Sequence, residues 1–230
     1  MPGKVVILSG SGLSAESGLP TFRDAAGLWR QYSWVELASP EGWRKHPELV
    51  LAFYNERRAK AWAAQPNAAH LALAALEKNF DVVVVTQNVD NLHERAGSTR
   101  VLHLHGELAY ARGTGPKRRR QRIDAAPIEM GQTCPEGTQL RPDIVWFGEE
   151  TRFLGEASEH VASADKVLVV GTSLSVYPAA GLVEYARADA EKVLNVLEME
   201  HVPADYRFMP GPATRIVPPL VDGWLRSHPP

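Results

Sequence analysis

KVVILSGSGLSAESGLPTFR, residues 4–23, is the stretch that decides the fold of this chain. Residues 4–8 form an apolar run that predicts a short buried parallel strand, and a glycine-rich turn follows at once. The turn, residues 10–15, fits the G-x-G-x-x-G/A dinucleotide pattern in the required context, between a strand and a helix. Gly10 and Gly12 permit a sharp turn and a close approach to a diphosphate, whose charge the N–H groups at the helix start would meet. The pattern indicates a nucleotide diphosphate site, although a tight turn that binds nothing also fits it.

The chain departs from the dehydrogenase form of this motif. A simple βαβ unit would place an acidic residue about 20 residues beyond the glycines, at the end of a second strand. Here the next convincing strand is Asp81–Thr86, far downstream. Pro20 also ends the first helix early, because proline cannot donate the backbone hydrogen bond that a helix interior needs. We therefore expect the nucleotide to lie beneath a loop.

Length and composition set limits on the function. With 230 residues, 44% of them hydrophobic, the chain can bury one main domain plus an insertion. A formal net charge of −2 gives no general attraction to nucleic acid or to an anionic membrane. No apolar run is long enough to span a membrane, and no signal sequence precedes the first strand, so we expect a soluble, cytoplasmic protein. The single cysteine, Cys134, excludes an internal disulfide and a site with several thiolates.

A helical insertion occupies residues 24–78, with long helical patterns at 47–62 and 67–78. Tyr54 and Arg57 are three residues apart and therefore share one helix face. A phenol beside a guanidinium can bind a carboxylate. A surface arginine beside a half-buried tyrosine explains the spacing more simply.

Polar residues follow the next two predicted strands. Residues 81–86, DVVVVT, form a strand of the kind buried on both faces, and it ends in the polar residues 87–93. The strand at 101–104 ends in His105. Open α/β sheets bind ligands at the carboxyl ends of their strands. A histidine there suits a general base, although a lone histidine at a strand end is more often structural.

From residue 141 onward the pattern is α/β again. Apolar runs predict buried strands at 166–170 and 192–196. Residues 177–181 predict the start of a helix with proline in its first turn, and residues 217–225 predict a last short helix.

These segments together resemble the signature motifs of the sirtuins, NAD-dependent protein lysine deacylases. The similar segments follow the family order over nearly the whole chain: residues 10–23, Thr86–Asp90, His105-Gly106, Val145–Glu149 and Gly171–Ser173. The resemblance implies an α/β fold with a Rossmann-like parallel sheet as the large domain. It implies a small domain formed by a helical insertion and a degenerate zinc-ribbon-like module. The expected division is 1–30, 79–108 and 141–230 for the NAD-binding domain, 31–78 for the helical part and 109–140 for the ribbon-like module.

The same resemblance implies a set of NAD-binding residues. They are Gly10, Ser11, Gly12, Ser14, Ala15, Glu16, Pro20, Thr21, Phe22, Arg23, Trp29, Gln87, Asn88, Val89, Asp90, Gly171, Thr172, Ser173, Asn195, Val196, Leu197 and Ala213. His105, Asn88 and Asp90 are the implied catalytic residues, with His105 as the base. In the family mechanism the acyl-lysine oxygen attacks C1′ of the nicotinamide ribose, and the base then takes a proton from a ribose hydroxyl. Nicotinamide and acyl-ADP-ribose are the expected products.

Substrate recognition is also implied by the resemblance. Residues Val145, Phe147, Gly148 and Glu149 would pair with the peptide through the main chain. Tyr54 and Arg57 match a Tyr-x-x-Arg motif of bacterial and mitochondrial sirtuins that bind the acid end of succinyl- or malonyl-lysine. We therefore expect activity on acidic acyl-lysines, with acetyl-lysine as a secondary substrate.

The chain departs from the sirtuin pattern at residues 109–142. Family members usually carry two Cys-x-x-Cys pairs that hold a structural zinc, whereas this chain has Gly113, Pro116 and Gly137 at three of the four positions and only Cys134 at the fourth. We therefore expect no bound metal. The basic run 117–122, KRRRQR, is typical of a solvated face or a contact for acidic substrates, and nucleic acid binding is the less favoured alternative.

Three functions remain open from the sequence. The preferred one is an NAD-dependent lysine deacylase that acts on acylated protein or peptide substrates, as a monomer without nucleic acid or membrane partners. The second is a mono-ADP-ribosyltransferase or an NAD hydrolase. The third is a non-catalytic NAD-binding interaction module.

Overall fold

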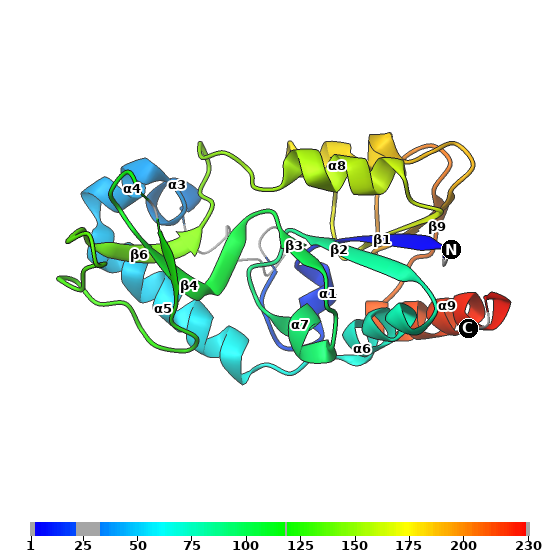
Figure 1. The fold of residues 1–230 in the computed structure, drawn as a ribbon, viewed down its shortest axis with the longest axis horizontal. Helices are drawn as coiled ribbons and strands as arrows, with labels where there is room; N and C mark the ends of the chain where they lie inside the picture. The colour runs from blue at the N-terminus through cyan, green and yellow to red at the C-terminus, as the bar shows by residue number, and fades with distance from the viewer. Residues whose placement is uncertain (1–2, 22–32, 118, 229–230) are drawn as a thin grey trace.

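The structure is a computed structural model that describes residues 3–21, 33–117 and 119–228 (Figure 1). Within these residues, six strands form a parallel sheet in the order β3-β2-β1-β7-β8-β9. They are β1 (Lys4–Ser9), β2 (Asp81–Thr86), β3 (Val101–His103), β7 (Lys166–Val170), β8 (Glu191–Asn195) and β9 (Arg207–Phe208). The expected parallel strands at 4–8, 81–86 and 166–170 are confirmed, and the strand expected at 192–196 is observed one residue earlier.

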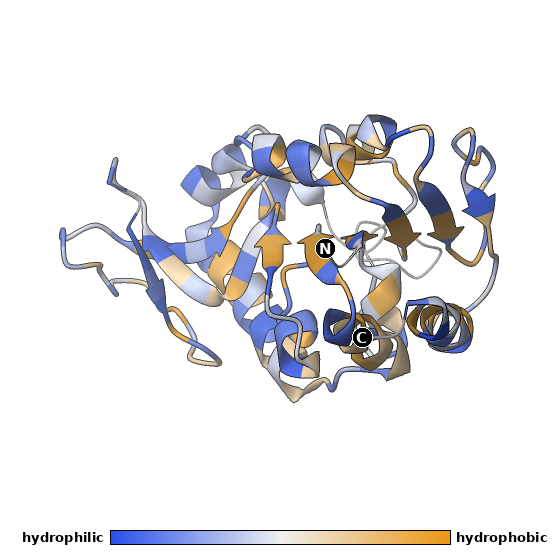
Figure 2. Cartoon of the chain, turned by 45° about the vertical axis from the view of Figure 1, so that its right-hand side comes forward, coloured by the Kyte–Doolittle hydropathy of each residue, from blue (hydrophilic) through white to orange (hydrophobic). Residues whose placement is uncertain are grey.

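The central strand β1 is buried on both faces, which explains its continuous apolar sequence. Alternate side chains point to opposite faces, so Val5 and Ile7 pack against α6 (Ala68–Ala75) and α9 (Ala213–Ser227). Val6 and Leu8 pack against α8 (Leu154–Ala162) and η2 (Ala179–Tyr185) on the other face. Figure 2 shows the hydrophobic strands between these two helical layers. The result is a three-layer Rossmann-like arrangement.

Sheet order creates a crevice beside β1. After β1 the chain crosses to β2 on one side, and β7 pairs with the other side of β1. In open α/β sheets such a reversal leaves a crevice at the carboxyl ends of the strands, where ligands bind. The turns that follow β1, β2, β7 and β8 all reach this edge.

A second, antiparallel sheet lies apart from the first, in the order β5-β4-β6 (Figure 1). Its strands are β4 (Gly106–Gly113), β5 (Arg120–Arg122) and β6 (Leu140–Ile144). We call residues 106–144 the arm. The sequence interpretation placed residues from 141 onward in the α/β domain. For residues 141–144 this was wrong, because they belong to β6, which pairs antiparallel with β4.

The arm therefore extends beyond the expected module 109–140 at both ends, and the expected domain division stays a proposal. Three helices cover the arm: α3 (Trp34–Leu37), α4 (Pro40–Lys45) and α5 (Pro47–Ala63). Their contact is a core cluster that includes Leu37, Phe53, Leu108 and Trp146. The remaining helices are α1 (Gly12–Ala15), η1 (Leu76–Lys78) and α7 (Leu92–Ala96).

Two helices differ from their expected form. The segment expected to start a helix at 177–181 is the 3-10 helix η2, which begins after Pro178. The last helix was expected at 217–225 but runs over Ala213–Ser227, with Pro218 and Pro219 inside it. Its strong apolar face, including Val217 and Trp224, packs on the sheet and outweighs the two missing hydrogen-bond donors. Among the described residues no helix is long and apolar enough to cross a membrane.

Side chains of α5 hold the arm in place. Asn55 pairs with the backbone of Ile128 like a neighbouring strand, since it accepts from the amide at 2.9 Å and donates to the carbonyl at 2.9 Å. Arg58 is buried and donates to the carbonyl of Leu108 at 2.7 Å. These bonds and the apolar packing connect the arm to the helix that carries Tyr54 and Arg57.

Two buried histidines predict how the stability of the fold depends on pH. His70 and His93 are both buried, with ring centroids 5.1 Å apart. Burial lowers the pKa of His70 to about 4 and the pKa of His93 well below its usual value. Between pH 4 and 6.5 these two rings therefore bind more protons in the unfolded chain than in the folded chain, so their contribution makes stability fall as the pH falls. His70 alone should cost about 2 kcal/mol of unfolding free energy at pH 5.

Urea unfolding at pH 7.5 and pH 5 tests this. His70→Gln removes the titrating ring, so we expect its stability to decline less than that of the unsubstituted chain over the same interval. Equal declines in both proteins would contradict the assignment.

Candidate active site

The glycine turn packs directly against the turn after β7. The amide of Gly12 donates to the carbonyl of Gly171 at 2.8 Å. A Cβ atom on Gly10 would lie 2.7 Å from the Cβ of Thr172, and one on Gly12 would lie 2.9 Å from the carbonyl oxygen of Gly171. Gly171 itself has φ +64 and leaves no room for a side chain against Leu13. The glycines are thus needed for this contact as well as for the expected approach of a diphosphate.

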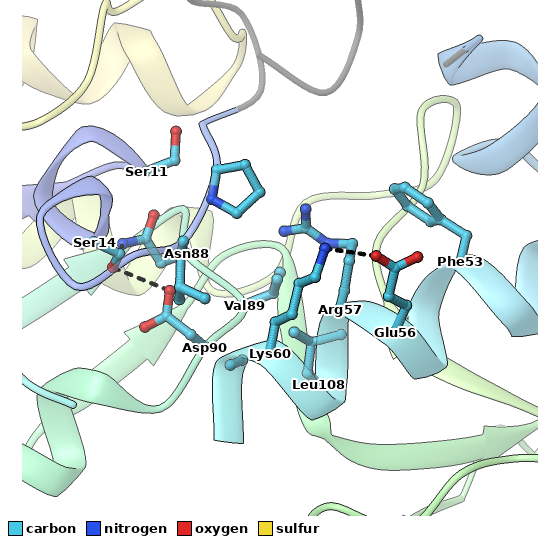
Figure 3. Close-up of a pocket in the computed structure, with 13 residues that line it drawn as sticks. Ser11, Ser14, Phe53, Glu56, Arg57, Lys60, Asn88, Val89, Asp90 and Leu108 are labelled. Carbon is cyan, nitrogen blue, oxygen red and sulfur yellow. Dashed lines mark hydrogen bonds and ion pairs between the residues drawn. The ribbon is translucent and has the colours of Figure 1, made fainter. Parts of the chain in front are cut away.

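Polar side chains from two strand ends meet beside α1. Asn88 donates from Nδ2 to Oγ of Ser14 at 3.1 Å, and Ser14 donates to Oδ2 of Asp90 at 3.1 Å (Figure 3). The amide of Leu92 donates to the other oxygen of Asp90 at 3.2 Å. Burial raises the pKa of Asp90, although the bonds from Leu92 and Ser14 oppose that shift. The three side chains, two from the loop after β2 and one from α1, form one connected group of donors and acceptors.

His105 lies at the start of the arm, next to this loop. Its Nδ1 is 3.3 Å from the carbonyl oxygen of Gln87. A carbonyl oxygen can only accept, so Nδ1 carries the proton and Nε2 is the basic nitrogen of the neutral ring. This tautomer suits a group that takes a proton from a substrate hydroxyl.

These groups line a main cavity of about 720 Å³, a size that fits a small-molecule site. The predicted cofactor residues on its wall are 10–12, 15, 16, 87–89, 171–173, 195–197 and 213. The predicted substrate residues Tyr54, Arg57, Val145, Phe147, Gly148 and Glu149 line it too, as does His105. The structure therefore brings the glycine turn and His105 to one cavity, although they are far apart in the sequence.

A side cavity of about 220 Å³ adjoins the main one. The predicted residues Ser14, Pro20 and Asp90 line it, and Ser11, Arg57, Asn88 and Val89 line both cavities. Thr21 lines neither of them. The predictions for Phe22, Arg23 and Trp29 lie outside the described residues.

Tyr54 lines the main cavity, and Arg57 lines both cavities. Burial raises the pKa of Tyr54 to about 12, which keeps the phenol protonated as a donor. Burial also lowers the pKa of Arg57, while Tyr54, Asp90 and Glu56 favour its charge. In Figure 3 the Arg57 side chain projects from α5 into the space opposite Asn88. Arg57 therefore does not extend along the outer surface, which was the simpler explanation of its spacing from Tyr54.

The segment 145–149 runs along the mouth of the main cavity. The amide of Val145 donates to the carbonyl of His105 at 2.9 Å, and the amide of Phe147 donates to the carbonyl of Ala38 at 2.9 Å. Glu149 accepts from the guanidinium groups of Arg112 and Arg141 at 3.0 Å. Its carboxylate thus fastens the segment to the arm. Its amide donates to the carbonyl of Trp146 at 2.9 Å, so a role for Glu149 in peptide binding would fall to its backbone carbonyl.

The ribbon-like part of the arm does not fit a structural zinc. Gly113 lies next to Cys134, since a Cβ atom on Gly113 would be 2.7 Å from Sγ of Cys134. Two of the four positions at which family members carry zinc ligands are therefore adjacent, but only one of them has a thiol. The thiol lies 3.2 Å from Oγ1 of Thr138 instead. Partly buried ion pairs connect the arm to the residues that follow it: Asp143 binds Arg152, and Arg141 binds Glu149.

One cluster in the described chain has metal-ligating side chains close together. Donor atoms of Glu94, His103 and Glu107 lie within 4.8 Å of one another. His103 uses Nδ1 and Nε2 in hydrogen bonds, and Arg120 pairs with Glu107. A cation would have to replace these bonds and displace the arginine, so we assign no metal there.

The basic run is part of the arm as well. In its described residues, Arg120 pairs with Glu107 and with Asp143, and Arg122 pairs with Asp124 at 2.6 Å. Arg120 also stacks over the ring of Tyr110, with its central carbon 3.8 Å from the centroid. These pairings serve the structure of the arm.

Sequence reasoning missed several residues of the two cavities. Lys60 and Glu56 line the side cavity, and the spacing of Lys60 three residues after Arg57 is the signal that could have identified it. Trp146 and Tyr177 line the main cavity. Tyr177 is 72% exposed and precedes η2, and no feature of its local sequence marks it as a cavity residue.

Comparison with known proteins adds a family match. Residues 10–178 match the model of the Sir2 family. An NAD-dependent protein deacylase of Helicobacter pylori strain J99 is 52% identical over 186 residues, covering 81% of this chain and 79% of that protein. A protein of the same name from Caulobacter vibrioides is 42% identical and covers 96% of this chain and 97% of its own length.

Solved structures agree with the sequence match. A mutant Sir2 homologue in complex with ADP-ribose superimposes with a TM-score of 0.90 at 37% identity, covering 98% of this chain and 93% of that one. A Sir2 homologue in complex with NAD gives a TM-score of 0.87 at 39% identity, over 98% and 91% of the two chains. A Sir2 protein bound to an acetylated peptide gives 0.77 at 28% identity, over 97% and 92%.

Proposed function

Because this chain belongs to the Sir2 family and is an NAD-dependent protein deacylase, we propose that its preferred substrates are succinyl- and malonyl-lysine, with acetyl-lysine secondary. The products would be free lysine, nicotinamide and 2′-O-acyl-ADP-ribose. The observation that carries the proposed preference is the place of Arg57, on the wall shared by the two cavities.

The chemistry of this wall favours an acidic acyl group. An acyl-lysine that enters the main cavity along segment 145–149 would bring its acyl end toward Tyr54 and Arg57. A partly buried guanidinium recognises a carboxylate through a planar fork of donors, and the protonated phenol of Tyr54 adds another donor. An acetyl group offers neither side chain an anionic partner.

The remaining residues suit the reaction. NAD supplies a ribose carbon that the acyl oxygen can attack as nicotinamide leaves. Asn88, Ser14 and Asp90 would bind the nicotinamide end, and the glycine turn with α1 would hold the diphosphate. His105 would accept a ribose hydroxyl proton at Nε2, because Nδ1 is committed to Gln87. Walls formed by both sheets would exclude water from the ribose, where positive charge develops as nicotinamide leaves.

The setting of the enzyme is also part of the proposal. We infer a cytoplasmic monomer that acts on protein or peptide substrates and has no nucleic acid partner. Support comes from the net charge of −2 and from the ion pairs that use Arg120 and Arg122 within the arm.

A panel of otherwise identical peptides tests the substrate preference. Succinyl-, malonyl- and acetyl-lysine peptides would be incubated with NAD, and nicotinamide release would give kcat/KM for each. We expect the two acidic peptides to exceed the acetyl peptide by about tenfold or more, the value of one charge-assisted hydrogen bond. An acetyl peptide that matches or exceeds them would contradict the proposal.

A further inference from the structure

A histidine–glutamate pair outside both cavities lies against the loop that carries Asn88 and Asp90. His103, the last residue of β3, is 4% exposed. Its Nδ1 lies 2.9 Å from the carbonyl oxygen of Asn88, and its Nε2 lies 2.7 Å from Oε1 of Glu94 on α7. Neither His103 nor Glu94 is a wall residue of the two cavities.

The hydrogen-bond pattern fixes the protons of this pair. A carbonyl oxygen can only accept, so Nδ1 of His103 donates to Asn88. One more proton lies between Nε2 and the carboxylate of Glu94. Burial would lower the pKa of His103, but Glu94 outweighs burial and raises it, while the pKa of Glu94 is lowered despite its own burial. Both pKa shifts favour a protonated His103 bound to an ionised Glu94. A hydrogen bond between charged groups is stronger than one between neutral groups.

The loop on which the pair acts is also held by its neighbours: the amide of Gln87 donates to the carbonyl of Ser9, and the carbonyl of Val89 accepts from the amide of Leu108. The amide of Asn88 donates to Oγ1 of Thr86 at 3.0 Å, and its carbonyl accepts from His103. With both backbone groups held, the Asn88 side chain points to Ser14, and Ser14 in turn reaches Asp90 (Figure 3). His105, which lines the main cavity, thus donates to the carbonyl of Gln87. His103, which lies outside the cavity, donates to the next carbonyl, that of Asn88.

We propose that His103 and Glu94 are positioning residues that hold the loop after β2 so that Asn88, Ser14 and Asp90 present one fixed surface to nicotinamide. This inference rests on the proposed nicotinamide site at those three residues. The pair acts on the nicotinamide end, because His103 bonds to the carbonyl of Asn88, whereas the turn at the diphosphate end is held by the bond from Gly12 to Gly171. Weakening the pair should therefore impair nicotinamide recognition and turnover without weakening the binding of ADP-ribose.

Glu94→Ala is the informative variant, because the Glu94 side chain is 38% exposed and its loss leaves the core intact. We expect kcat to fall and the inhibition constant for added nicotinamide to rise, each by about tenfold, the value of one charge-assisted hydrogen bond. The dissociation constant for ADP-ribose, measured by calorimetry, should stay within about twofold. Glu94→Gln keeps a neutral acceptor for Nε2–H and should recover part of the loss.

Matched variants separate the possible results. Glu156→Ala removes a comparable partly exposed glutamate–histidine pair on α8 and should change none of the three constants. If Asn88→Ala raises the nicotinamide constant but Glu94→Ala does not, the positioning role is wrong and the proposed function stands. If neither variant changes it, the nicotinamide site and the positioning role are both wrong. A parallel loss of ADP-ribose affinity in Glu94→Ala would show general loosening and overturn the inference.

Discussion

Replacing His105 by alanine is expected to abolish deacylation while NAD binding stays largely intact. The ring lines the main cavity, and its Nδ1 bond to Gln87 leaves Nε2 as the proton acceptor. A positioned general base contributes about 10²–10⁴-fold to a rate, so kcat should fall by that factor. Nicotinamide release from an acyl peptide measures kcat, and calorimetry with NAD measures binding.

A control variant and the binding measurement make the His105 result specific. His201→Ala removes an exposed histidine and should turn over normally. Near-normal turnover of the His105 variant would remove His105 from the mechanism. A loss of NAD affinity equal to the loss of kcat would give the ring a binding role in place of an acid–base role.

Replacing Arg57 by methionine should reverse the order of substrates. Removing one partner of a buried, hydrogen-bonded charge pair costs about 2–5 kcal/mol, which corresponds to roughly 30-fold or more. We expect kcat/KM for a succinyl peptide to fall by at least that factor. The value for an acetyl peptide should change by less than about threefold, since an acetyl group has no charge for the guanidinium to bind. Paired progress curves on the two peptides measure both values.

Two further variants define the contribution of this wall. Tyr54→Phe removes one donor and keeps the ring packed edge-on against Phe53, so its effect should be smaller and in the same direction. Arg44→Met on α4 removes an exposed arginine and should leave both peptides unaffected. An unchanged preference for succinyl-lysine in Arg57→Met would defeat the proposed acid recognition.

Much of the large sheet could be predicted because its strands are buried on both faces. Residues 4–8, 81–86 and 166–170 are continuous apolar runs, and each ends in polar or glycine residues at the ligand-binding edge. The polar strand ends identified Gln87, Asn88 and His105 before any tertiary contact was known, and these residues do line one cavity. For these residues, the local sequence pattern and the position at the end of a strand were sufficient for the prediction.

Features that depend on tertiary pairing escaped the sequence. β6 has the composition of a strand in either sheet, and only its register with β4 decides between them. The last helix is longer than expected and contains Pro218 and Pro219, because packing on the sheet overrides the local preference against proline. The steric need for Gly10 beside Thr172 arises from residues that are distant in the sequence.

The side-chain partners of the site were equally hidden. The ion pairs of Glu149 and the bond between Asn55 and Ile128 join residues whose separation along the chain carries no periodic signal. These contacts explain how segment 145–149 and the arm are held in place although the arm carries a single thiol.

Mass spectrometry of the nucleotide product tests the central claim most directly. The enzyme would be incubated with NAD and a succinyl-lysine peptide, and the products followed at early times. The account predicts succinyl-ADP-ribose, formed one-for-one with nicotinamide and deacylated peptide. Free ADP-ribose that appears without deacylated peptide, or a peptide that gains an ADP-ribosyl group, would contradict it.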